Sequence, residues 1–430
     1  MHKPASRNPW TWVPSLYVAE GIPYIMAVTV SVILYKRLGI SNTDIAFYTS
    51  WLYLPWVIKP FWSPLVDLFR TKRYWILLMQ LLVGASLACI ALTIPAGRFF
   101  QYTLAFFWLM AFSSATHDIA ADGYYMLGLT EDLQAAFAGV RTTFYRIITI
   151  ATKGGLVIFA GYLEGSGRDI PTAWSIALFV AAAALGALFL YHFFVLPYPT
   201  PDRPASRNPS MSFGSEFVHV FGLFFRKKGI VTILAFFLFY RFAETQIVKI
   251  LAPFLLDPRS KGGLGLTTSE VGIIYGTVGV IALMLGGLLG GYAIYRKGLR
   301  FWIWIMVCAM DLPNLVYVYF SQVLPDNFYL INLCVAVEQF GYGFGFTAYT
   351  MFMIMVSEGE HKTVHYAIST GIMALGMMVP AMASGWLQEQ MGYRNYFLWV
   401  MATTIPGLIV TALVKIDPEF GKRKDSPQGR

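Results

Sequence analysis

Long apolar runs separated by short polar stretches fill almost the whole chain. A helix that crosses a bilayer needs roughly 20 predominantly apolar residues, and most of these runs reach that length. The pattern therefore predicts an all-α membrane protein with twelve transmembrane helices. The expected spans are 12–34, 45–68, 75–95, 102–128, 139–162, 172–196, 230–255, 268–294, 302–320, 328–356, 367–387 and 396–414.

The composition excludes a soluble domain. Hydrophobic residues make up 57% of the chain and charged residues only 13%, whereas soluble domains carry about 25% charged residues. The three cysteines all lie within expected helices, so neither a disulfide framework nor a zinc-binding spacing is indicated. The first span is long and lacks a small-residue cleavage site, which predicts an uncleaved anchor.

The basic residues in the loops predict the orientation in the membrane. With a cytoplasmic N-terminus, the inner loops and ends hold twenty Lys and Arg residues and the outer loops hold seven. Because cytoplasmic loops are enriched in Lys and Arg, both termini are expected in the cytoplasm. The net charge of +9 follows from this bias, and the scattered cations do not indicate nucleic-acid binding.

The sequence contains an internal repeat. The segment Leu38–Ile45 resembles Leu264–Val271 at an offset of 226 residues, and the pair Phe69-Arg70 aligns with Tyr295-Arg296 at the same offset. This duplication predicts two six-helix halves joined by a polar loop. The expected divisions are an N-terminal half at 1–196, a cytoplasmic linker at 197–229, a C-terminal half at 230–415 and a cytoplasmic tail at 416–430.

This layout resembles the major facilitator fold, in which two parallel repeats enclose a substrate site near the midplane of the membrane. The segment Ser63–Arg73 is similar to the cytoplasmic signature of that superfamily, an Asp followed by basic residues. The acid and the bases could latch the two halves at the inner face, or they could serve only to orient the chain. The gate candidates are Asp67, Arg70, Lys72, Arg73 and Arg296.

Four N-terminal segments narrow the resemblance to the AmpG-type muropeptide permeases, a branch that includes acetyl-CoA transporters. They are Leu16–Tyr24, Lys59–Asp67, Lys72–Trp75 and Ala115–Asp122. The resemblance implies proton-driven import of anhydromuramyl disaccharides, with or without a peptide, across the bacterial inner membrane. The chain departs from the family pattern at His117, where the permeases usually carry Gln.

Charged residues within the expected spans are the main functional candidates, because a charge in hydrocarbon persists only in a polar cavity or beside a partner. Asp118 and Asp122 are four residues apart and share one helix face. Either they carry protons, which their mutual repulsion would favour, or they pair with Arg146 or Lys153. Arg241 either pairs with Glu244 within its helix or binds an anionic substrate. The spans also contain Lys249 and Asp311.

Two sets of site residues follow from these candidates and from the fold that the resemblance implies. The proton-coupling candidates are Asp118, Asp122, Glu20, Glu244 and Glu338. The substrate-binding candidates are Arg146, Arg241, Lys59, Lys153, Tyr24, Tyr124, Tyr145, Tyr240 and Tyr342. The near balance of acids and bases leaves open a second reading, in which every buried charge is paired for structural reasons.

The sequence gives little indication of nucleotide or metal binding. The glycines Gly341, Gly343 and Gly345 favour close helix packing over a nucleotide loop, and His361 and His365 lack a metal-binding pattern. No cofactor is expected besides the proton gradient. We expect a monomer whose partners are the lipid bilayer and a small sugar or sugar-peptide substrate. The alternatives are an exchanger for acetyl-CoA or another large organic anion, and a membrane sensor or enzyme.

Overall fold

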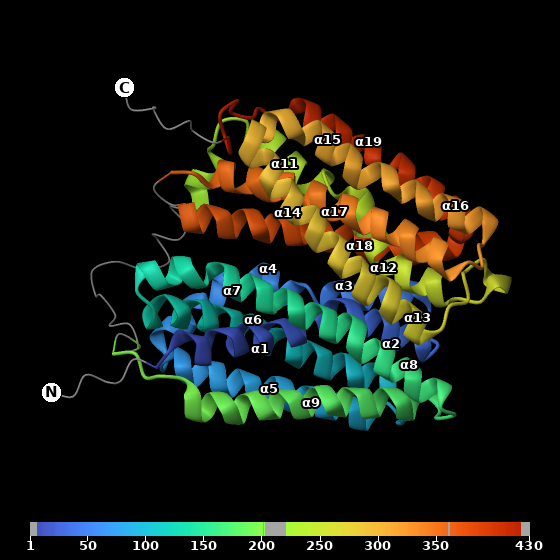
Figure 1. Cartoon of the computed structure of the whole chain (residues 1–430), viewed down its shortest axis with the longest axis horizontal. Helices are drawn as coiled ribbons and strands as arrows, with labels where there is room; N and C mark the ends of the chain where they lie inside the picture. The colour runs from blue at the N-terminus through green and yellow to red at the C-terminus, as the bar shows by residue number, and fades with distance from the viewer. Residues whose placement is uncertain (1–6, 201, 203–220, 360–361, 423–430) are drawn as a thin grey trace. The chain divides into compact units, whose positions relative to one another are not determined.

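The computed structural model describes residues 7–200, 202, 221–359 and 362–422. Every regular element among these residues is a helix (Figure 1). Eight helical segments in this part of the chain are long and apolar enough to cross a membrane, as the apolar pattern predicts for an all-α membrane protein. Two more expected spans correspond to helices of 30 residues that carry buried polar side chains, α6 (Phe99–Gly128) and α17 (Phe328–Ser357). The count of twelve stays a prediction.

The helices pack into two compact units. The first unit comprises residues 1–41, 48–208 and 267–277, and the second comprises 42–47, 209–266 and 278–430. Each unit therefore contains a short segment that the sequence repeat assigns to the other half. The predicted division at residues 196 and 230 stays a prediction.

The first unit is built around α5, which packs against both α6 and α9 (Figure 1). At one end, Trp12, Tyr17 and Tyr124 belong to a buried apolar cluster that joins α1 to α6. Its elements are η1 (Pro9–Thr11), α1 (Val13–Ile25), η2 (Met26–Val30), α2 (Ser31–Arg37), α4 (Leu54–Leu68), α5 (Lys72–Thr93), α6, α7 (Glu131–Ile150), η3 (Ala151–Leu156), α8 (Val157–Gly165) and α9 (Ile170–Val195).

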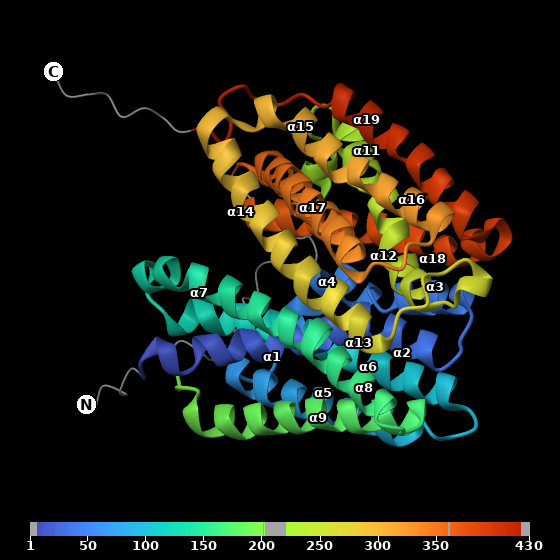
Figure 2. The same cartoon turned by 45° about the vertical axis from the view of Figure 1, so that its right-hand side comes forward.

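The second unit is built around α17, which packs against α14 and α15 (Figure 2). Gly392, at a φ of 71°, interrupts α18 between the two spans expected at 367–387 and 396–414. The helices are α11 (Ile230–Phe239), α12 (Phe242–Leu256), α14 (Gly279–Lys297), α15 (Leu299–Asp311), α16 (Leu315–Val323), α17, α18 (Lys362–Ala402) and α19 (Thr404–Leu413), with the short turns η4 (Arg259–Lys261) and η6 (Leu312–Asn314).

Side-chain caps mark where several helices begin. The Thr267 side chain accepts a bond from the backbone of Glu270, whose carboxylate bonds back to Thr267, a capping box that starts α13 (Thr268–Val271). The π-helical turn η5 (Gly272–Val278) continues α13 into α14. In the other repeat, α3 (Asn42–Trp51) begins at Asn42, 226 residues before Thr268. At α9, hydrogen bonds from Thr172 hold the pKa of Asp169 below its ordinary value.

The segment at 267–277 is anchored within the first unit. The Thr268 hydroxyl donates to Glu164 Oε2 at 2.7 Å, and Arg37 Nη2 lies 2.8 Å from the same oxygen. The Ser269 hydroxyl donates to the carbonyl of Ile158 at 3.2 Å, and α13 packs against α8 (Figure 1). These bonds fasten the start of the expected eighth span to the end of the expected fifth.

Glycines let α17 approach its neighbours closely. A Cβ atom added at Gly341 would overlap the carbonyl oxygen of Ala309 in α15, and one added at Gly343 would overlap that of Leu283 in α14. Gly345 faces Met310 in α15 with similarly little space. The expectation of close helix packing at these glycines is confirmed.

We expect Gly341→Ala to destabilise the protein by at least about 1–3 kcal/mol, the usual cost of overpacking a well-packed core. The matched control is Gly291→Ala in the interior of α14, where an added Cβ meets no atom within 4 Å. That control should be neutral or slightly stabilising, because Ala has the higher helix propensity. Thermal unfolding of both variants in one detergent is the measurement, and equal melting temperatures would contradict the close-packing account.

Candidate functional site

Asp118 lies at the centre of a polar cluster in the first unit. Its Oδ2 accepts a hydrogen bond from Trp56 Nε1 at 2.9 Å and lies 3.9 Å from Lys59 Nζ, both on α4. Its other oxygen, Oδ1, is buried and has no hydrogen-bond partner among the described residues. Half of this carboxyl group is therefore free to take a proton or a bond from a ligand.

Asp122 lies one helical turn further along α6 and has other partners. Its Oδ1 accepts a bond from Arg141 Nη2 at 2.8 Å and one from the Tyr17 hydroxyl at 3.3 Å. The Arg141 guanidinium lies over the rings of Tyr17 and Tyr125, with 4.3 and 4.9 Å to the ring centroids. The side chains of Arg141 and Asp122 remain 33% and 45% exposed, so the protein does not enclose the pair.

Glu20 completes the acidic cluster, by which we mean Glu20, Asp118 and Asp122. Its carboxyl group interacts electrostatically with both aspartates, and its Oε2 is buried without a hydrogen-bond partner in the described chain. Gly21 allows α1 to lie directly against α7, since an added Cβ there would lie 2.5 Å from Ile148. The close approach positions Glu20 beside α7.

The basic residues near the acidic cluster differ from those expected. Lys59 and Arg141 contact the two aspartates, in place of the Arg146 and Lys153 that the sequence offered as partners. Lys153, in the π-helical turn η3, lies 3.2 Å from the centroid of the Tyr275 ring. Arg146 is half-buried on α7 and forms no ion pair among the described residues.

The predicted aromatic residues separate into two groups. Tyr24 packs edge-on against Trp56, with 5.1 Å between the ring centroids, and so lies beside the partner of Asp118. Tyr145 lies against Gly21, 3.4 Å from its added Cβ, and interacts electrostatically with Glu20. Tyr124 instead belongs to the apolar core and donates to the carbonyl of Pro197 at 2.6 Å. Its hydroxyl has a structural partner.

Arg241 is the main polar residue of the second unit and lies at a helix break. α11 ends at Phe239 and α12 begins at Phe242, with Arg241 as the N-cap residue at a φ of −108°. Its Nη2 donates to the Tyr342 hydroxyl at 2.5 Å, and its guanidinium lies 4.8 Å from the centroid of the Phe346 ring. The planar cation is thus held between aromatic side chains.

The other predicted residues of the second unit are buried. Glu338 accepts a bond from the Tyr317 hydroxyl at 2.6 Å, and the Tyr240 hydroxyl donates to the carbonyl of Gly345 at 3.1 Å. Glu244, like Lys249, is buried on α12. Asp311 was not among the sequence candidates for the site, yet both of its buried carboxylate oxygens have no hydrogen-bond partner in the described chain.

Sequence reasoning also missed a buried hydrogen-bonded chain beside the acidic cluster. Gln80 Nε2 lies 3.0 Å from His117 Nε2, and Gln80 Oε1 lies 2.9 Å from His192 Nδ1. His192 Nε2 in turn lies 2.9 Å from the Ser15 hydroxyl. The chain links α6, α5, α9 and α1, and it holds the helix turn that carries Asp118. In the sequence, the departure from the family pattern at His117 was the one signal that could have indicated this chain of hydrogen bonds.

The gate candidates lie at helix ends in both units, at the junction of α4 and α5 in the first unit and at the end of α14 in the second. The backbone amides of Lys72 and Arg73 donate to Asp202 at 2.7 and 3.1 Å, which fixes the start of α5. The Arg73 guanidinium donates to the Phe193 carbonyl at 2.5 Å. Arg70 and Arg296 are exposed. The Asp67 side chain lies outside what the structure describes, as does His361.

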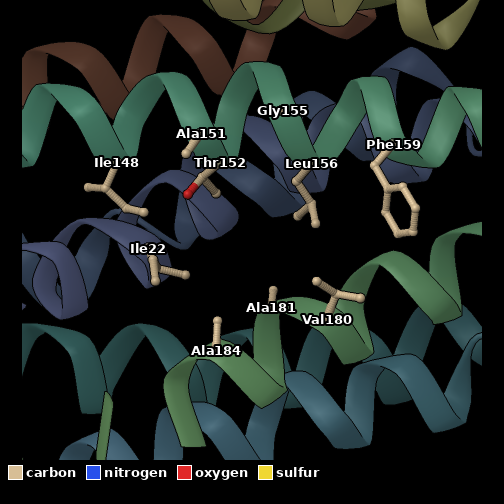
Figure 3. Close-up of a pocket in the computed structure, with 10 residues that line it drawn as sticks. All are labelled: Ile22, Ile148, Ala151, Thr152, Gly155, Leu156, Phe159, Val180, Ala181 and Ala184. Atoms are coloured by element: carbon tan, nitrogen blue, oxygen red, sulfur yellow. The ribbon is translucent and has the colours of Figure 1, made fainter. Parts of the chain in front are cut away.

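An apolar pocket of about 300 Å³ lies between α1, α9 and the helix formed by α7, η3 and α8. Ile22, Leu156, Phe159 and Val180 line it, and Thr152 is its one polar side chain (Figure 3). A pocket without charge suits a lipid tail better than a sugar. The acidic cluster is therefore the better candidate for polar ligands in this unit.

Comparisons with known proteins agree with this architecture. The chain is 24% identical over 408 residues to the putative transporter AmpG 4 of Rickettsia conorii, covering 92% of this chain and 94% of that protein. It is also 24% identical over 418 residues to the anhydromuropeptide permease of Escherichia coli K12, covering 95% and 80%. The crystal structure of the nucleoside transporter NupG aligns with a TM-score of 0.69 at 14% identity, covering 95% and 98%.

The family model described as Major Facilitator Superfamily matches residues 16–358, most of the chain. The helical fold of this chain, its apolar helices and its relatives all agree with that match. The protein is therefore a multi-pass membrane transporter and not an enzyme, and it belongs to the Major Facilitator Superfamily.

Proposed function

We propose that this transporter imports anhydromuramyl disaccharides, with or without a peptide, by proton-coupled alternating access. The observation that carries the proposal is the acidic cluster, in which Glu20 Oε2 and Asp118 Oδ1 are buried without hydrogen-bond partners among the described residues. An ionised carboxylate within a membrane is costly unless it is paired, so a proton or a substrate donor is the natural partner of these oxygens. The names of the relatives support the substrate class.

The contacts of the cluster suit a sugar-peptide ligand. Carboxylate oxygens accept hydrogen bonds from sugar hydroxyls or peptide amides, and the adjacent ring of Tyr24 offers an apolar face for a sugar. Arg146 has no ion pair in the described chain and can bind the muramyl carboxylate with two parallel bonds. In this proposal Asp118 and Glu20 exchange protons while Arg146 holds the anionic end of the substrate.

The proposal places the transporter in the bacterial inner membrane as a monomer, with both termini in the cytoplasm. The twenty-to-seven distribution of basic residues supports this orientation. Import towards the cytoplasm is then driven by protons moving in the same direction. Exchange of acetyl-CoA or another large organic anion is the second candidate, favoured by the cationic residues Arg146 and Arg241 within the membrane helices.

Uptake into proteoliposomes tests the proposal. We expect labelled anhydromuramyl disaccharide to accumulate only when a proton gradient is imposed, and a protonophore should abolish this accumulation. Liposomes without protein provide the baseline. Gradient-independent uptake that instead requires liposomes preloaded with acetyl-CoA would overturn the symport proposal in favour of the exchanger.

A further inference from the structure

Besides the apolar pocket of the first unit, a second cavity lies at helix ends of the second unit. Its volume is about 760 Å³, within the usual range for small-molecule sites. The residues that line it come from the start of α11 and from the ends of α17 and α19. These are helix ends, so the cavity lies where membrane-spanning helices meet the polar boundary of the bilayer.

Three lysines make the lining of the cavity strongly basic. Lys227, Lys228 and Lys415 all line it, and none of the described lining residues is acidic. α11 begins beside them after Gly229, which adopts a φ of 76° and provides no side-chain cap. The first amides of that helix and its positive dipole end therefore add to the field of the lysines. We call this volume the lysine cavity.

Lys227 has the most restricted environment of the three lysines. It is half-buried, and it donates to the carbonyl of Val356 at the end of α17. Capping a helix C-terminus would be a sufficient structural role for one lysine, but an ammonium has three donors and this bond uses one. Burial lowers the pKa of Lys227, because it disfavours the charged ammonium. An anion beside this lysine would stabilise the charged form.

Most of the other lining residues are apolar. Ile233, Phe352 and Leu413 are among them, and Leu413 is 60% exposed. Val231 on α11 and Ile409 on α19 are further exposed apolar side chains of the lining helices, at 77% and 53% exposure. A basic pocket lined by helices that carry exposed apolar side chains matches a molecule with an anionic head and a hydrocarbon tail.

We propose that the lysine cavity binds the phosphate head of an anionic phospholipid, whose acyl chains lie along α11 and α19. Basic pockets between membrane helices are suited to such headgroups, because lysines attract the phosphate while the tails stay in hydrocarbon. The proposal rests on the membrane-spanning fold and on these residues, and it is independent of the transported substrate.

Native mass spectrometry of the purified full chain tests this site, with phosphatidylglycerol and phosphatidylcholine as probes. We expect phosphatidylglycerol to bind at least tenfold more tightly to the wild type, a difference of about 1.4 kcal/mol. The double variant Lys227→Gln with Lys415→Gln should lose this preference. The matched control is Lys297→Gln with Lys422→Gln, which removes the same charge at exposed positions outside the cavity and should keep the preference.

Two results would overturn the proposal. Equal losses in the test and control pairs would show a general effect of surface charge, and competition by millimolar inorganic phosphate would identify a small-anion site. If Lys227→Gln impairs folding, Lys228→Gln with Lys415→Gln replaces it, because both of these lysines are exposed. That pair should also lose the preference, and its retention of the wild-type preference would count against the site.

Discussion

Replacing Asp118 with Asn is expected to lower proton-driven uptake of anhydromuramyl disaccharide by at least about 100-fold, while the protein still inserts. The Asn amide oxygen can still accept the bond from Trp56, so the local structure should persist. The amide cannot take up a proton at the position of the unpartnered Oδ1. A 100-fold loss corresponds to about 2.8 kcal/mol, which is within the range for a desolvated charged group.

A second assay separates proton coupling from substrate binding and so makes this test specific. Exchange of labelled for unlabelled substrate across proteoliposomes needs no net proton movement, so Asp118→Asn should retain exchange while it loses accumulation. Asp326→Asn is the control, because that carboxylate is 89% exposed in a loop. Normal accumulation with a normal pH dependence in both Asp118→Asn and Asp122→Asn would exclude either aspartate as an essential proton carrier.

Replacing Arg146 with Gln should weaken binding of the free-acid ligand by about 2–5 kcal/mol, roughly 30-fold to several thousand-fold. Arg146 is half-buried on α7 without an ion pair among the described residues, so a ligand carboxylate would be its charged partner. An ester of the same ligand should bind the wild type as weakly as the free acid binds the variant. Isothermal titration calorimetry of both ligands measures this difference.

Two further variants locate the contact. Arg168→Gln, in an exposed loop, should bind both ligands as the wild type does. Arg241→Gln removes a guanidinium that already bonds to Tyr342, and an ester-sensitive loss there instead would assign the carboxylate to the second unit. If the wild type binds acid and ester equally well, neither arginine recognises a carboxylate.

The helices were predictable because lipid imposes a simple requirement on sequence. A span must be apolar for about 20 residues, so the limits of α5, α6 and α17 agree with the expected spans within a few residues. The common face of Asp118 and Asp122 followed from their four-residue spacing. The close approach of α17 to α14 and α15 followed from its glycines in the same way.

The partners of these residues were not predictable, because they depend on how helices pack. Arg141, at the start of the span expected at 139–162, was one of the twenty basic residues counted at the inner loops and ends, yet it bonds to Asp122 once α7 lies against α1. Tyr124 was a substrate-binding candidate, but its direction on α6 takes it into the apolar core. Gln80 and His192 are 112 residues apart in sequence, and the bond between them depends on the packing of α5 against α9.

The position of residues 267–277 in the first unit has a consequence for biosynthesis. These residues supply the bonds from Thr268 to Glu164 and from Ser269 to Ile158, but the ribosome makes them after the rest of that unit, which ends at residue 208. The delay from residue 208 to residue 277 is 69 residues, about 3–14 seconds at ordinary rates of synthesis. During that interval the Glu164 carboxylate can bond to Arg37 and Trp174 but not yet to Thr268, so the contacts of the first unit are completed only as the second unit is being made.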